Sequence, residues 1–160
     1  TPIVSAPSRP VTVLRDYHAE NIMLIEGREG HKRLGLLDFQ DALAGHPAYD
    51  LVSMLQDARR SVSAEIEEEL FAHYVSLANP HDGFEAAYHL LGVQRNLKIL
   101  GIFTRLWKRD GKPRYRAFQG RVWGYVERSL AHPALAPARA WLDANVPQDK
   151  RASAWAEFAE

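Results

Sequence analysis

The chain has 160 residues, of which 46% are hydrophobic and 25% are charged, and its 20 basic and 20 acidic residues cancel to a formal net charge of zero. These values are typical of a folded globular protein and give no polybasic signal for nucleic acid or an anionic membrane. Because cysteine is absent, disulfides, a cysteine nucleophile and thiolate-bound metal centres are excluded, and a cytoplasmic location is expected. No apolar run is long enough to span a membrane.

The first third of the chain is predicted to hold short strands. Residues 1–10 carry three prolines and no helical period, so we expect an extended lead-in. Short β-prone runs at residues 11–14, 21–25 and 34–37 predict three strands, and the last two are expected to form a hairpin.

After Pro47 the apolar residues recur at helical spacing, which predicts a series of helices. The second helix should follow Ser63 and carry an apolar stripe, and the third should open with a capping box of Asp82 and Glu85. The stripe consists of Ile66, Leu70, Tyr74 and Leu77. The predicted helices are residues 48–59, a segment after Ser63, a long helix from Asp82 to Lys112, residues 116–130, a short helix from Pro137 to Leu142, and residues 152–159. The predicted fold class is therefore α+β and mostly α, a small β patch followed by a helical bundle.

Oxygen-bearing side chains lie where the short strands end. Asp16 follows the first strand, Asn21 comes five residues later, and Asp38 follows the third strand. Oxygen ligands of this kind suit Mg²⁺, which takes one or two carboxylates together with phosphate oxygens and water. A remaining carboxylate can accept a proton from a hydroxyl group, so the pattern contains the parts that phosphoryl transfer requires.

The segments VLRDYHAENIML and LGLLDFQDALAGHPAYDL resemble the catalytic and metal-binding loops of the aminoglycoside phosphotransferase and choline kinase superfamily. The resemblance implies that Asp16 is the catalytic base and that Asn21 and Asp38 are the Mg²⁺ ligands. It also implies that Asp50 and Arg15 brace the catalytic loop.

Together with QRNLKILGIFTRL further along, these segments are similar to the bacterial cell-wall-recycling kinases that use ATP to phosphorylate the anomeric hydroxyl of N-acetylmuramate and N-acetylglucosamine. The resemblance implies that residues 11–160 form the C-terminal, catalytic and helical lobe of a protein-kinase-like fold. The β hairpin patch would carry the catalytic and metal loops. Residues 1–10 would lead in from an N-terminal, nucleotide-binding lobe that the sequence lacks. The isolated chain is therefore expected to be inactive.

Charge is segregated along the chain. Residues 61–85 hold six acidic and no basic residues, whereas residues 95–121 hold nine basic residues and one acidic residue. If the basic helix faces the cleft, it favours a neutral or carboxylate-bearing sugar over a polycationic aminoglycoside. Arg95, Asn96 and Lys98 are the candidates for substrate contact, and the alternative is a solvated helix face.

Two further residues of the loops have two interpretations each. His18 could touch phosphate or substrate, or make a structural hydrogen bond to the loop. Asp41 could bind substrate or metal, or hold its own loop.

Other functions stay open at this point. The acceptor could be an aminoglycoside or a choline-like molecule, or the chain could be a non-catalytic kinase-like binding module. A metal-dependent hydrolase using Asp16, His18 and Asp38 lacks evident further ligands.

Overall fold

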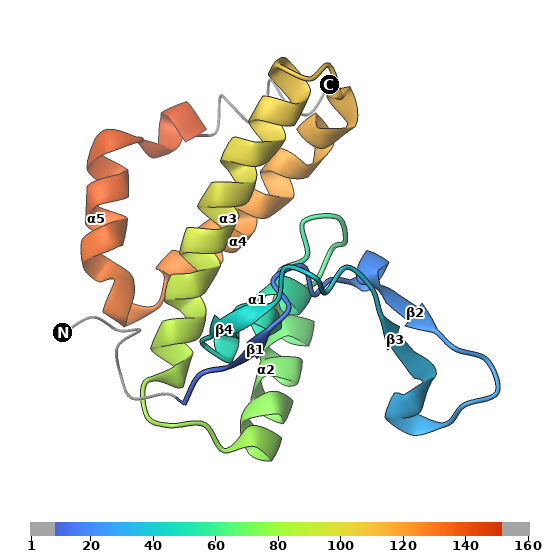
Figure 1. Cartoon of the computed structure of the whole chain (residues 1–160). Coiled ribbons are helices and arrows are strands. Elements are labelled where there is room, and N and C mark those ends of the chain that lie inside the picture. The colour runs from blue at the N-terminus through green and yellow to red at the C-terminus, as the bar shows by residue number, and fades with distance from the viewer. Residues whose placement is uncertain (1–8, 152–160) are drawn as a thin grey trace. The chain divides into compact units, whose positions relative to one another are not determined.

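The structure, a computed structural model, describes residues 9–151, which divide into two compact units (Figure 1). The first unit holds the residues up to 57 together with 62–84, and the second holds 58–61 together with the residues from 85 onward. Helices dominate and the strands are short, which confirms the predicted mostly helical α+β class.

Two small antiparallel sheets form the start of the first unit. Strand β1 (Val11–Val13) pairs with β4 (Leu43–Gly45), and β2 (Ile22–Leu24) pairs with β3 (Leu34–Leu36). The predicted hairpin is confirmed, and Figure 1 shows it extending away from the β1–β4 pair. Strand β4 was not predicted. The 3₁₀ turns η2 (Ala19–Asn21) and η3 (Gly30–Arg33) stand beside β2 and β3.

Helices α1 (Ala48–Leu55) and α2 (Ala64–Ala78) complete the first unit. Ser63 caps α2 as predicted, because its side-chain oxygen accepts a hydrogen bond from the Ile66 backbone N–H, and two glutamates lie in the first helical turn. The buried apolar side chains of this unit come from β1, from α1 and from the residue that opens the next helix. They are Val13, Ala48, Val52, Leu55 and Phe84.

Most of the predicted apolar stripe of α2 is exposed, and Tyr74 is half-buried. Leu77 is 74% exposed, and Ile66 and Leu70 are also exposed. Leu70 and Leu77 line an open groove of about 580 Å³ between α2, α1 and β1. The buried side chain near the start of α2 is instead Glu67, whose carboxylate accepts a 2.7 Å hydrogen bond from the amide of Gln56.

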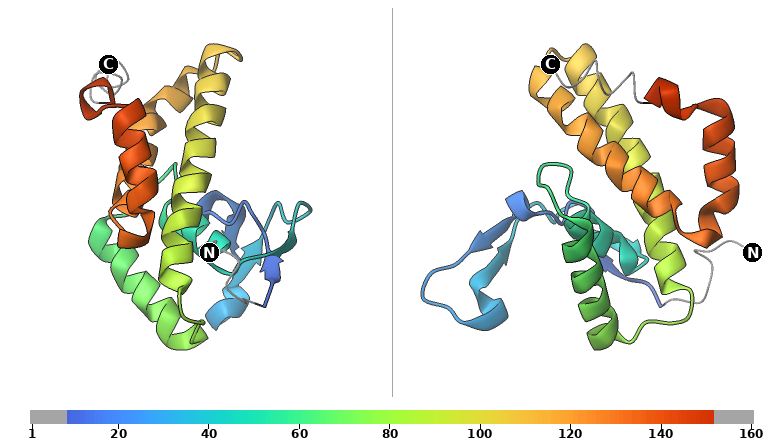
Figure 2. Two further views of the ribbon diagram at one scale, coloured as in Figure 1. Left: turned by 90° about the vertical axis from the view of Figure 1, so that its left-hand side faces the viewer. Right: turned by 180° about the vertical axis from the view of Figure 1, so that it is seen from behind.

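The second unit is helical. Its elements are α3 (Phe84–Lys108, from Glu85 onward in this unit), η4 (Pro113–Phe118), α4 (Gln119–Leu130), η5 (Pro133–Leu135) and α5 (Ala136–Asn145). Helices α3 and α4 lie side by side in both views of Figure 2. Pro137 lies in the first turn of α5 as predicted. The helix predicted at residues 152–159 lies outside the described residues.

The long helix α3 differs from its prediction at both ends. It begins at Phe84, after Gly83 with a φ of 87°, so Asp82 and Glu85 do not occupy the positions of a capping box. It ends at Lys108, before the predicted stop. Its Phe103 packs with Ala58 and Val122 in the core of the unit.

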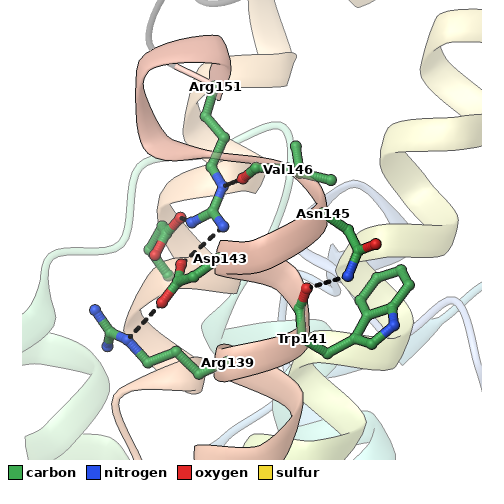
Figure 3. A network of polar contacts seen from close by, with 7 residues as sticks. Arg139, Trp141, Asp143, Asn145, Val146 and Arg151 are labelled. Atoms are coloured by element: carbon green, nitrogen blue, oxygen red, sulfur yellow. Dashed lines mark hydrogen bonds and ion pairs between the residues drawn. The ribbon is translucent and has the colours of Figure 1, made fainter.

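A buried guanidinium ties the end of the second unit to α4 and α5. The Arg151 side chain is 3% exposed and donates at 2.8 Å from Nη1 to Glu127 and from Nη2 to Asp143. Its Nε also donates to the carbonyl of Val146, as Figure 3 shows. A planar guanidinium can serve three acceptors at once, whereas an ammonium group cannot match this geometry.

We expect Arg151→Lys to lower the free energy of unfolding by about 1–3 kcal/mol, because two charge-assisted hydrogen bonds are lost or distorted while both carboxylates can still reach water. Chemical denaturation measures the change. Arg139→Lys is the matched control: the Arg139 side chain is 42% exposed and its Nε lies 3.8 Å from Asp143, so a change within about 0.5 kcal/mol is expected. Equal effects of the two substitutions would contradict a stabilising role for the Arg151 contacts.

Candidate active site

The loop after β1 is held at its start by Asp50 in the first turn of α1. Oδ2 of Asp50 accepts a 2.7 Å hydrogen bond from the Leu14 backbone N–H, and Oδ1 accepts a 3.0 Å bond from that of Arg15. Arg15 has a φ of 71°, in the left-handed region that side chains other than glycine seldom adopt. Asp50 therefore holds a strained backbone in place directly before Asp16.

Within this loop, Asp16 and Asn21 lie together. The Asn21 side-chain Nδ2 donates a 2.9 Å hydrogen bond to the Asp16 backbone carbonyl, which closes the turn between them. The Asp16 side chain is exposed. Because Nδ2 of Asn21 is engaged with the loop, its Oδ1 is the atom of the amide left to face a ligand.

His18 is buried inside the same loop. Its side chain is 6% exposed, its backbone carbonyl accepts the Asn21 N–H, and its Nε2 lies 3.5 Å from Asn21 Nδ2. This environment favours the structural interpretation of His18 over substrate contact.

The Asp38 loop is joined to the Asp16 loop through the backbone. The Leu37 N–H donates a 2.9 Å hydrogen bond to the Asn21 carbonyl, which places Asp38 one residue beyond this contact. Asp38 itself has a φ of 58°, in the left-handed region. Each of the two loops therefore has a left-handed residue at its acidic side chain: Arg15 directly before Asp16, and Asp38 itself. The side-chain amide of Gln40 donates to Oδ1 of Asp38. Asp41 is exposed in the following turn.

Gln40 is a residue whose role the sequence analysis missed. Its Nε2 orients the Asp38 carboxylate and leaves Oδ2 as the other oxygen for a ligand. The signal available in the sequence was a long amide side chain two residues after a predicted metal ligand.

The donor set fits a Mg²⁺ ion. Asp38 and Asn21 each offer an oxygen to the ion, while the exposed carboxylate of Asp16, in the same unit, is left to accept a proton. Over residues 9–151, no three histidine, aspartate or glutamate side chains converge as a closed metal cage. Mg²⁺ does not need such a cage, because it keeps several waters and is commonly shared between one or two carboxylates and substrate phosphates.

The three residues predicted to contact substrate lie on α3 in the second unit. Asn96 is fully buried and Arg95 is nearly so, while Lys98 is exposed. Arg95 and Asn96 are thus not part of a solvated helix face. Lys98 keeps a side chain that a ligand can reach.

Curated relatives of the chain carry one name. This chain is 49% identical over 139 residues to a protein of Caulobacter vibrioides, and the match covers 86% of this chain and 38% of the relative. It is 39% identical to a protein of Neisseria meningitidis (88% and 43% covered) and 38% identical to one of Pseudomonas aeruginosa (92% and 45% covered). Each relative is named N-acetylmuramate/N-acetylglucosamine kinase.

The chain therefore spans less than half the length of these relatives. A sequence model of the phosphotransferase enzyme family matches residues 4–90, more than half of the chain. The matched segment includes both loops described above, with Asp16, Asn21 and Asp38, and the helix that carries Asp50. On this match, the chain belongs to the phosphotransferase enzyme family.

Proposed function

We propose that this chain is the catalytic, C-terminal lobe of a kinase that transfers a phosphoryl group from ATP to the anomeric hydroxyl of N-acetylmuramate or N-acetylglucosamine. The observation that carries the proposal is the hydrogen-bonded arrangement of Asp16, Asn21 and Asp38 in a chain 49% identical to a kinase named for these two sugars. Absence of cysteine fits a reaction in the reducing cytoplasm, where ATP is available.

In the proposed reaction, Asp16 accepts the proton of the sugar hydroxyl. The sugar oxygen then forms a bond to the γ-phosphorus of ATP, the bond from that phosphorus to the bridging oxygen breaks, and ADP leaves with its electron pair. Asn21 Oδ1 and Asp38 Oδ2 would hold Mg²⁺, which neutralises charge on the phosphate oxygens. Gln40 orients Asp38 through its hydrogen bond, and Asp50 holds the backbone that presents Asp16.

Exposed apolar side chains support the proposal that a further lobe covers the hairpin. Ile22 faces Leu36 and Leu24 faces Leu34 across the strands, so these four share one face, while Met23 lies on the other. Leu24 is 69% exposed, and Met23, Leu34 and Leu36 are exposed as well. A two-stranded hairpin with apolar residues on both faces has little stability of its own. We propose that the nucleotide-binding lobe of the whole protein covers this surface, and that the isolated chain does not turn over ATP.

The alternative acceptors define the test. We expect the full-length protein, given ATP and Mg²⁺, to phosphorylate N-acetylmuramate or N-acetylglucosamine, with a phosphorus NMR signal characteristic of a sugar 1-phosphate. Choline and an aminoglycoside serve as the competing acceptors under the same conditions. Phosphorylation of an aminoglycoside without formation of a sugar 1-phosphate would defeat the substrate assignment, and no transfer to any acceptor would favour a non-catalytic binding module.

Within the described chain, no helix is both long and apolar enough to cross a membrane. Lys98 stays a predicted substrate residue, and its side chain is exposed. Arg95 and Asn96 also stay predicted substrate residues, and their side chains are buried.

A further inference from the structure

Two histidines of the first unit, His46 and His81, lie beside each other although 35 residues separate them. His46 follows β4, and its Nδ1 accepts a 3.2 Å hydrogen bond from the Ala48 N–H at the start of α1. His81 lies in the turn between α2 and α3, and its Nδ1 lies 2.7 Å from the carbonyl oxygen of Asp82. The ring centroids are 5.8 Å apart and the rings are nearly perpendicular.

These contacts assign the tautomer of each neutral ring. Because Nδ1 of His46 must offer a lone pair to the Ala48 N–H, its ring proton lies on Nε2. A carbonyl oxygen can only accept, so Nδ1 of His81 carries the proton and its Nε2 keeps the lone pair. One ring thus presents a donor and the other an acceptor.

Both Nε2 atoms are buried, and neither has a hydrogen-bond partner in the part of the chain that the structure describes. A buried polar atom without a partner is costly, and a donor and an acceptor left in the same place can satisfy each other.

The surroundings favour a neutral pair. The buried ring of Phe84 stacks on His46 and meets His81 edge-on. Burial lowers the pKa of His46, and charge repulsion from His81 lowers it further. Burial also raises the pKa of Tyr74 above 10.0, so this phenol stays neutral at acid pH. The other titratable side chains on the adjoining segments are Tyr49, Asp50, His73, Asp82 and Glu85.

We propose that His46 and His81 form a neutral imidazole pair, joined by an Nε2–H···Nε2 hydrogen bond, which fixes the start of α1 and so positions Asp50 for the catalytic loop. This role in catalysis rests on the proposed kinase function. Ala48 opens α1 and Asp50 follows two residues later, with its carboxylate on the Leu14 and Arg15 N–H groups. The pair therefore acts on the loop through the helix.

The pair makes the fold sensitive to acid. A protonated His46 carries hydrogen on both ring nitrogens, so it can no longer accept from Ala48. Because its pKa in the folded protein lies below the ordinary 6.5, the unfolded state binds more protons in this range. The contribution of the neutral His46 to the free energy of unfolding is therefore complete above about pH 6.5 and is lost as the pH falls below this value.

The tautomers are tested directly by nitrogen NMR of the imidazole rings in the full-length protein at pH 7.5. We expect the proton on Nε2 in His46 and on Nδ1 in His81, and a pKa of His46 below the ordinary histidine value of 6.5. The opposite tautomer in either ring, or a pKa of His46 at or above the ordinary 6.5, would overturn the proposal. This measurement does not depend on any enzymatic activity, so it separates failure of the pair from failure of the proposed function.

The positioning role is tested with variants assayed for sugar phosphorylation across pH. His46→Phe removes the acceptor for Ala48 and should lower kcat roughly tenfold at pH 7.5 with KM for ATP unchanged, whereas His46→Asn, which can still cap the helix, should recover most of this loss. Both variants should lack the loss of activity that the unmodified protein shows below about pH 6.5. His31→Asn is the matched control, with the original pH profile. A His46→Asn variant that keeps the original acid sensitivity would refute the positioning role, whether or not His46→Phe folds.

Discussion

Replacing Asp16 with asparagine is expected to lower kcat for sugar phosphorylation roughly 10²–10⁴-fold, the contribution of a well-placed general base. Asparagine keeps the size of the side chain, and the hydrogen bond from Asn21 goes to the backbone carbonyl of residue 16, so the loop should keep its shape. The loss should therefore fall on kcat, with KM for ATP nearly unchanged. Steady-state kinetics of the full-length protein with N-acetylglucosamine and Mg²⁺–ATP measures both parameters.

Two further measurements make this result specific. Glu26→Gln removes an exposed carboxylate from the loop of the β2–β3 hairpin and should leave kcat unchanged. The Asp16→Asn variant should bind Mg²⁺–ATP as the unmodified protein does, since Asn21 and Asp38 remain. Wild-type turnover in the Asp16→Asn variant would refute the proposed base, and loss of nucleotide binding would assign Asp16 to the metal instead.

The loops that carry the candidate site could be predicted from the sequence because their signals are local. Asp16 and Asn21 stand five residues apart in one turn, and the hydrogen bond between them forms within that turn. Asp38 directly follows a short β-prone run that pairs with its neighbour in the chain. Spacing and strand propensity therefore identify such residues without knowledge of distant contacts.

Features that depend on distant contacts could not be predicted. Strand β4 is formed by Leu43, Ala44 and Gly45, two of which are weak strand formers, and it exists because β1 lies beside it. The burial of Glu67 was not predicted either, because it depends on the side-chain amide of Gln56, eleven residues earlier, which donates a hydrogen bond to the Glu67 carboxylate. Periodicity describes a face of a helix but not what covers it. For this reason the apolar stripe of α2 could be predicted, whereas the open groove that Leu70, Tyr74 and Leu77 line could not.

The histidines show the same limit. His46 and His81 have no sequence spacing typical of a metal site, so the sequence alone does not single them out. Their tautomers follow from a backbone N–H on one ring and a carbonyl on the other, which only the folded turns supply. The tautomers and protonation behaviour of two neighbouring histidines can be inferred only when the hydrogen-bond partners of both rings are known.

Replacing Asp50 with alanine is expected to lower the free energy of unfolding by about 2–4 kcal/mol, because the Leu14 and Arg15 N–H groups each lose a bond to a charged acceptor. Ser53→Ala is the smaller matched change: it removes the 3.3 Å bond from the Ser53 hydroxyl to the Arg15 carbonyl and should cost about 1 kcal/mol. Chemical denaturation compares the two. An Asp50→Ala variant as stable as Ser53→Ala would contradict the assigned strength of the Asp50 contacts.

The same substitution should also reduce kcat beyond its effect on folding, because Asp50 holds Arg15 in a left-handed conformation directly before Asp16. That conformation costs a residue with a side chain about 1–2 kcal/mol, whereas glycine adopts it freely. Once Asp50 is lost, Arg15 can relax and carry Asp16 away from its position. Arg15→Gly, added to Asp50→Ala, should therefore restore part of kcat, and added alone it should change kcat little. If the double variant is no more active than Asp50→Ala at a concentration where both are folded, the strain at Arg15 has no part in presenting Asp16, and Asp50 acts on stability alone.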